Sequence, residues 1–106
     1  FPYNGVTTSF ESIWMGVPVL TLVGNSMMGR IAGSAMTRLG YSEFVTASPE
    51  AYVSCAKDIV LDLPRLSKIR YGLRKSANKS IFNSQLHVCE LENACRDIWV
   101  NYCKNN

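Results

Sequence analysis

The sequence contains little charge, and its long uncharged stretch is the first feature to explain. Only 18% of the 106 residues are charged, and residues 12–29 include no charged side chain. A membrane-spanning helix needs about 20 consecutive apolar residues, but Gly16, Pro18 and Gly24 interrupt this stretch. We therefore expect no membrane partner and interpret the stretch as a buried strand between two turns.

Metal-binding patterns are also scarce. The one histidine, His87, has no partner at ligand spacing, and the four cysteines form no Cys-x-x-Cys pair. We expect no metal site. The cysteines, which are Cys55, Cys89, Cys95 and Cys103, are scattered over apolar helix faces. This usage is typical of a reducing compartment, so we expect a cytoplasmic protein. The sequence alone leaves a disulfide between two of them open.

The chain has no strong excess of either charge. Its net charge of +3 is too small to indicate a nucleic-acid partner. Six of the eleven basic residues do fall between Arg65 and Lys79, where no acidic residue occurs. Such a segment is either a phosphate-binding stripe or the solvated face of an outer helix. We favour the solvated face and expect no nucleic acid.

Repeats and low-complexity segments are absent, and 106 residues form one domain at most. The order of predicted elements is helix, strand, helix, strand and three further helices. The elements span Thr7 to Met15, Pro18 to Val23, Arg30 to Leu39, Glu43 to Thr46, then helices from Pro49, from Pro64 and from Asn83 to Tyr102. This order predicts an α/β fold with about two parallel strands, too few for a complete doubly wound sheet. The chain also begins at Phe1 without a methionine, so we expect it to be part of a larger domain.

Apolar residues at helical spacing predict which helix faces are buried. The helix from Pro49 has Tyr52, Val53, Ala56, Ile59 and Val60; the helix from Pro64 has Leu66, Ile69 and Leu73; the last has Val88, Leu91, Cys95, Ile98 and Tyr102. Trp14 and Trp99 are expected in the core. An incomplete sheet leaves a strand edge unpaired and apolar surface exposed, so we expect either homodimerisation or weak stability.

The start of the first helix is the candidate binding site. Its first backbone N–H groups lack partners within the helix and attract anions, most often phosphates. Gly5 lets the backbone approach a ligand, while Thr7 and Thr8 offer hydroxyl donors. Glu11, one turn further, is suited to accept hydrogen bonds from ribose hydroxyls. The alternative is a capping box in which Thr8 and Glu11 satisfy each other's backbone donors. Residue patterns alone favour capping.

Longer stretches carry a resemblance that reverses this preference. FPYNGVTTSFESIWMGVPVLTLVG, followed by GRIAGSAMTRLGYSEFV, resembles the C-terminal catalytic half of the O-linked N-acetylglucosamine transferase family, which includes Spindly-type relatives. The resemblance implies a GT-B fold, in which two Rossmann-like domains enclose a nucleotide-sugar cleft. It also implies an inverting, metal-independent transfer of N-acetylglucosamine from its UDP donor to Ser or Thr of proteins, with no cofactor. Spindly-type members imply GDP-fucose as the alternative donor.

Positions that match the family's motif imply roles for single residues. Gly5, Thr7 and Thr8 match the element that binds the donor diphosphate, and Glu11 matches the acidic residue that contacts the donor ribose. Outside the motif, Arg30 opens a helix just after a glycine turn, near the expected pocket, so it either faces the diphosphate or forms an ion pair with Glu43. Where family members have histidine before the threonines, this chain has Val6.

The resemblance implies that residues 1–106 form part of the C-terminal nucleotide-sugar-binding domain. The upstream half-domain, the N-terminal catalytic domain and the helical repeats that select a protein acceptor would lie outside it. The general base would lie there too, so we expect this chain to contain no catalytic residue and to be inactive alone. The competing hypothesis is a non-catalytic helical interaction module.

Overall fold

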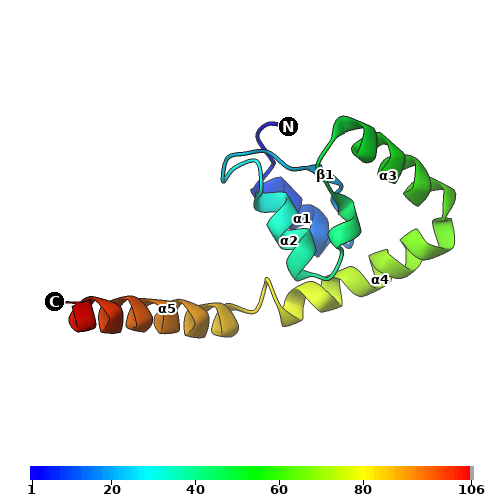
Figure 1. Ribbon diagram of the computed structural model, residues 1–106. Coiled ribbons are helices and arrows are strands. Elements are labelled where there is room, and N and C mark those ends of the chain that lie inside the picture. Colours follow the sequence, from blue (N-terminus) through cyan, green and yellow to red (C-terminus); the bar gives the residue numbers. More distant parts are fainter. Residues whose placement is uncertain (106) are drawn as a thin grey trace.

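The computed structural model describes residues 1–105 and has the predicted order of elements (Figure 1). The helices and strands are α1 (Thr7–Trp14), β1 (Thr21–Leu22), α2 (Ile31–Arg38), the 3-10 helix η1 (Ser42–Phe44), β2 (Val45–Thr46), α3 (Pro49–Leu61), α4 (Leu63–Lys79) and α5 (Ser84–Asn105). The two strands pair in parallel, with Thr21 opposite Val45 and Leu22 opposite Thr46. The predicted fold class is right, although both strands are shorter than the sequence pattern suggested.

Local side-chain chemistry fixes where the later helices begin. Ser48 accepts a hydrogen bond from the Ala51 N–H at 3.2 Å, with Pro49 in the first helical position, as predicted. Asp62 caps α4 in the same way through the Arg65 N–H at 3.0 Å. Asn83 accepts from the Leu86 N–H at 3.0 Å at the start of α5.

The core lies where α1, α2 and α4 meet. Its most deeply buried large side chains are Ile13, Met36, Phe44 and Leu73. Ile69 and Leu73 confirm the predicted buried face of α4. Trp14 is 39% exposed and covers the edge of this core, because its ring packs edge-on against Phe82 and under the Arg74 guanidinium.

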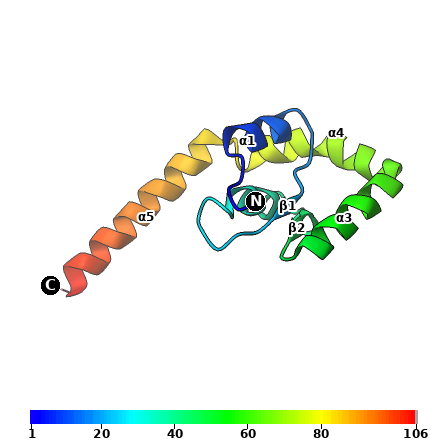
Figure 2. The ribbon, with the colours of Figure 1, turned by 90° about the horizontal axis from the view of Figure 1, so that it is seen from above.

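Two predicted apolar faces are not buried. Neither α3 nor α5 contains a buried residue within the described chain, so the predicted burial of Val53, Val60 and Ile98 is wrong here. Trp99, expected in the core, is 65% exposed. For α5 the physical reason is geometric: it extends away from the other elements, so most of its length packs against no other part of residues 1–105 (Figure 2).

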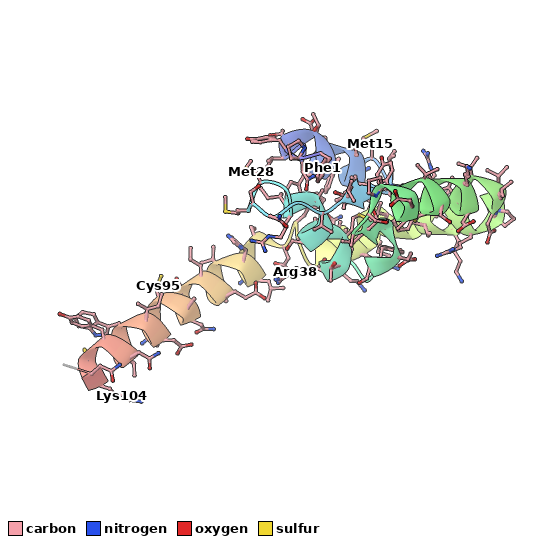
Figure 3. All side chains as sticks on the ribbon, turned by 45° about the horizontal axis from the view of Figure 1, so that its top comes forward. Phe1, Met15, Met28, Arg38, Cys95 and Lys104 are labelled. Carbon is pink, nitrogen blue, oxygen red and sulfur yellow. The ribbon has the colours of Figure 1, made fainter. Side chains whose placement is uncertain are left out.

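The base of α5 is linked to the body by an ion pair. The Arg38 guanidinium donates to both carboxylate oxygens of Glu90, at 2.6 and 2.8 Å. Figure 3 shows Arg38 near the point where α5 leaves the body, whereas Cys95 and Lys104 lie further along the helix. The Arg38 and Glu90 side chains are both about half exposed, so their ion pair contributes little to stability.

Gly16 and Gly40 end α1 and α2 with the same motif and provide a matched test. Both have positive φ, of 76° and 85°, and both donate to the carbonyl three residues earlier. A Cβ at Gly16 would lie 2.7 Å from the Arg70 carbonyl oxygen, whereas a Cβ at Gly40 would meet nothing within 4 Å.

We expect Gly40→Ala to lower the free energy of unfolding by about 1 kcal/mol, the cost of the left-handed conformation alone. Gly16→Ala should cost at least about 2 kcal/mol, because the clash with α4 is added. Urea unfolding of both variants measures the difference. Equal losses would show that the contact between Gly16 and α4 is not this close.

Candidate functional site

The segment before α1 lies against the loop that follows β1. The Asn4 N–H donates to the Met28 carbonyl oxygen at 3.1 Å. A Cβ on Gly29 would lie only 2.8 Å from the Pro2 carbonyl oxygen, so the two backbones touch there. Phe1 and Met28 mark these two segments in Figure 3. The start of α1 therefore lies at the carboxyl end of the parallel strands, where open α/β proteins bind ligands.

The capping box predicted as the alternative is wrong. The N-cap of α1 is Val6, not Thr8, and no side chain caps this helix. Val6 already has helical backbone angles, and its carbonyl oxygen accepts from the Ser9 and Phe10 N–H groups. Thr8 is therefore inside the helix. Within residues 1–105, the N–H groups of Thr7 and Thr8 have no acceptor.

The structure brings Gly5, Thr7 and Thr8 together at this open helix start. A Cβ on Gly5 would collide with Thr8 Oγ1, so glycine is required for the threonine side chain to lie over the turn. The Ser9 hydroxyl is occupied, because it donates to the Gly5 carbonyl oxygen at 2.7 Å. Both threonines are exposed. Their hydroxyls and amides are thus available to an anion.

Glu11 lies one turn beyond the threonines. Positions three and four residues apart share one face of a helix, so its carboxylate is on the same side as Thr7 and Thr8. It is exposed and forms no ion pair within the described residues. The arrangement allows an acidic group to bind hydroxyls next to a bound anion.

Arg30 lies at the start of α2 and is exposed. The predicted alternative, an ion pair with Glu43, is wrong, because Glu43 pairs with Arg65 at 3.1 Å. Arg30 forms no salt bridge in the part of the chain that the structure describes. A cation at this helix start adds to the positive potential at the carboxyl end of the strands.

A cavity of about 410 Å³ lies beside Gly5. It is lined mainly by apolar and aromatic side chains, including Tyr3, Leu20 and Tyr52. Thr7, Thr8 and Glu11 are not part of its lining. Sequence reasoning missed this cavity because no local spacing pairs the segments that line it, which lie within residues 1–5, 19–22 and 49–53, with Ser9 and Ala32 added from α1 and α2.

Few other groups have unusual chemistry. Burial, together with the Asp58 carboxylate, raises the pKa of the Cys55 thiol above its ordinary value, and Sγ donates to the Glu43 carbonyl oxygen. All four cysteines are free thiols. Among residues 1–105, no group of three or more His, Cys, Asp or Glu side chains could hold a metal ion. No helix in that range has the length and hydrophobicity to cross a membrane.

Comparisons with known proteins give consistent matches. The family model described as glycosyl transferase family 41 matches residues 2–91. The chain is 36% identical, over 98% of its length, to the probable UDP-N-acetylglucosamine–peptide N-acetylglucosaminyltransferase SPINDLY of Arabidopsis thaliana. It is 28% identical, over 93% of its length, to the Caenorhabditis elegans UDP-N-acetylglucosamine–peptide N-acetylglucosaminyltransferase. The chain spans only 12% and 9% of these relatives.

A solved structure agrees with the sequence matches. A mutant of Thermobaculum terrenum O-GlcNAc transferase superposes with a TM-score of 0.87 at 38% identity. The match covers 99% of this chain and 20% of that one. At 38% identity, the two chains share sequence as well as fold.

Proposed function

Because this chain belongs to glycosyl transferase family 41, we propose that it holds the diphosphate and ribose of a nucleotide-sugar donor. Its structure matches the corresponding part of an O-GlcNAc transferase, in agreement with the predicted α/β fold of the C-terminal catalytic region. The protein that contains it would be a transferase that glycosylates Ser or Thr of other proteins. UDP-N-acetylglucosamine is the donor that the names of its relatives support.

The uncapped start of α1 is the observation that carries this proposal. An ordinary surface helix satisfies its first N–H groups with a side chain, as α3 and α4 do. At α1, the N–H groups of Thr7 and Thr8 are left open beside two exposed hydroxyls. Open amides, hydroxyl donors and the positive end of the helix dipole together form a site for phosphate oxygens.

Glu11 and Arg30 complete the proposed donor site. Glu11 would accept hydrogen bonds from the ribose hydroxyls, since it lies on the same face of α1 as the threonines. Arg30 would add positive charge next to the diphosphate from the start of α2. Both side chains are exposed and form no ion pair within the described residues.

The site would promote transfer by stabilising the leaving group. When the bond between the sugar and the diphosphate breaks, negative charge develops on the diphosphate oxygens. Fixed hydrogen-bond donors stabilise this charge in the transition state, as they do in an oxyanion hole. We propose that Thr7, Thr8 and the helix start perform this role without a metal ion. Inversion at the sugar carbon would follow from direct attack by the acceptor hydroxyl.

Titration with UDP, and separately with GDP, tests the proposal through the backbone amide NMR signals of the chain. We expect saturable shifts that cluster between Gly5 and Glu11, while amides near Gly40 stay unchanged. GDP is included because resemblance to Spindly-type members implies a guanine nucleotide. A dispersed spectrum without shifts at Gly5 to Glu11 would contradict donor binding and favour an interaction module.

A further inference from the structure

Asn4 has a role that neither the helix pattern nor the family motif indicated. The helix α2 begins at Ile31, and its own N-cap, Arg30, provides no side-chain hydrogen bond. Instead, Asn4 Oδ1 accepts from the Ala32 N–H at 3.4 Å. The capping group thus comes from 28 residues upstream. Asn4 is 7% exposed although its side chain is polar, so this amide is part of the interior.

Asn4 holds two segments at once. Its side chain binds the first turn of α2, and its backbone N–H donates to the Met28 carbonyl oxygen in the loop before α2. That loop is closed on itself, because the Gly24 N–H donates to the Gly29 carbonyl oxygen at 2.9 Å. The Pro2 carbonyl oxygen also lies so close to Gly24 and Gly29 that a Cβ on either would be 3.3 or 2.8 Å from it, so the two backbones pack directly against each other.

The residue after Asn4 is Gly5, the first residue of the proposed diphosphate site. Two peptide units separate Gly5 from Thr7, so Asn4 links the segment that leads into the open amides of α1 to the start of α2, next to Arg30. A diphosphate with two phosphate groups needs its donors at a fixed separation, because small misplacement of binding groups costs much of their effect. A side chain from the segment before α1 that bonds to the first turn of α2 helps to fix this separation.

We propose that Asn4 is a positioning residue for donor binding, which sets the separation between the starts of α1 and α2. The inference rests on the proposed function. Because Asn4 is buried and its side chain bonds to α2, it would act on the donor through Gly5, Thr7 and Thr8. Removing its side chain should therefore weaken binding of the nucleotide diphosphate without altering the acceptor side of the reaction.

The experiment compares Asn4→Ala with Thr46→Val in the natural protein that contains this chain. Thr46 is the matched control, because it is also 7% exposed and also makes one buried hydrogen bond, from Oγ1 to the Thr21 carbonyl oxygen at 2.9 Å. Each variant loses one such bond, but Thr46 joins the two strands and does not contact the proposed donor site. The measurements are the Kd for UDP, the KM for the donor and for the acceptor, and the unfolding midpoint.

We expect Asn4→Ala to raise the UDP Kd and the donor KM by about tenfold, as loss of a helix cap would. The acceptor KM should not change. Thr46→Val should lower the unfolding midpoint as much as Asn4→Ala does, but it should leave the UDP Kd unchanged. Asn4→Ser, which keeps an uncharged oxygen acceptor at this position, should recover part of the UDP affinity. It also serves if Asn4→Ala does not fold.

Equal UDP affinity in Thr46→Val and in whichever Asn4 variant folds would overturn the positioning role. Thr8→Ala separates this failure from failure of the proposed function. If Thr8→Ala weakens UDP binding and Asn4→Ala does not, only the inference about Asn4 is wrong. If neither changes it, the donor site itself is wrong, and the role of Asn4 with it.

Discussion

Replacing Thr7 and Thr8 together by alanine is expected to reduce turnover of the natural protein by at least about 100-fold. Removal of one donor from a site that stabilises developing charge lowers kcat by about 100-fold to 1,000-fold. The two hydroxyls act on the same diphosphate, so their effects should not simply multiply. The loss should appear in kcat as well as in the donor KM, because the bound diphosphate is already negative and gains further charge as the sugar bond breaks.

Single variants and a control locate the effect at the helix start. Thr8→Ser keeps a hydroxyl and should retain most activity, whereas Thr8→Ala should not. Thr37→Ala is the matched control, because Thr37 is an exposed threonine on α2. Unchanged turnover in the double variant would show that Thr7 and Thr8 do not stabilise the leaving group. A loss in Thr37→Ala of the same size would attribute the effect to the fold instead.

Leu73→Ala is expected to have the largest effect on stability. Leu73 is 0% exposed and lies on α4 in contact with the core that Ile13 and Met36 form. Truncating a leucine in such a site costs about 2–5 kcal/mol, since the surroundings collapse only partly around the cavity. A small domain has only about 5–15 kcal/mol of stability. The variant should therefore unfold at much lower urea concentration, or fail to fold.

Leu61→Ala provides the comparison, because it removes the same atoms from a side chain that is 85% exposed at the end of α3. Its cost should stay within about 0.5 kcal/mol. Urea unfolding followed by circular dichroism measures both. If Leu61→Ala costs as much as Leu73→Ala, Leu61 is covered in the natural protein by a contact outside the described residues.

Local chemistry explains why several elements were predictable. The start of α3 depends only on residues 48 to 51, because Ser48 caps the helix and Pro49 occupies its first position. Gly16 and Gly40 each end a helix with a positive φ, which glycine adopts easily. The parallel pairing of the strands followed from compact apolar character and from the helix between them. All of these signals operate over a few neighbouring residues.

Contacts between distant segments explain the errors. The capping box failed because the backbone of Val6 is already helical, in a segment that Asn4 and Met28 join across 24 positions of sequence. Glu43 pairs with Arg65 rather than Arg30 for the same reason: α4 brings Arg65 near, which no spacing could indicate. Helical periodicity identified the apolar faces of α3 and α5 but carries no information on what covers them.

The ion pair at the base of α5 has a mechanical consequence. An exposed pair such as Arg38 and Glu90 contributes about 0–1 kcal/mol. That is little energy to fix the orientation of a helix of 22 residues. Such a helix is about 33 Å long, so a rotation of about 10° at its base moves the far end by about 6 Å. That displacement exceeds the reach of a side-chain contact. A fixed position for the tip of α5 would therefore need contacts beyond this pair, because within residues 1–105 most of the helix lies away from the other elements.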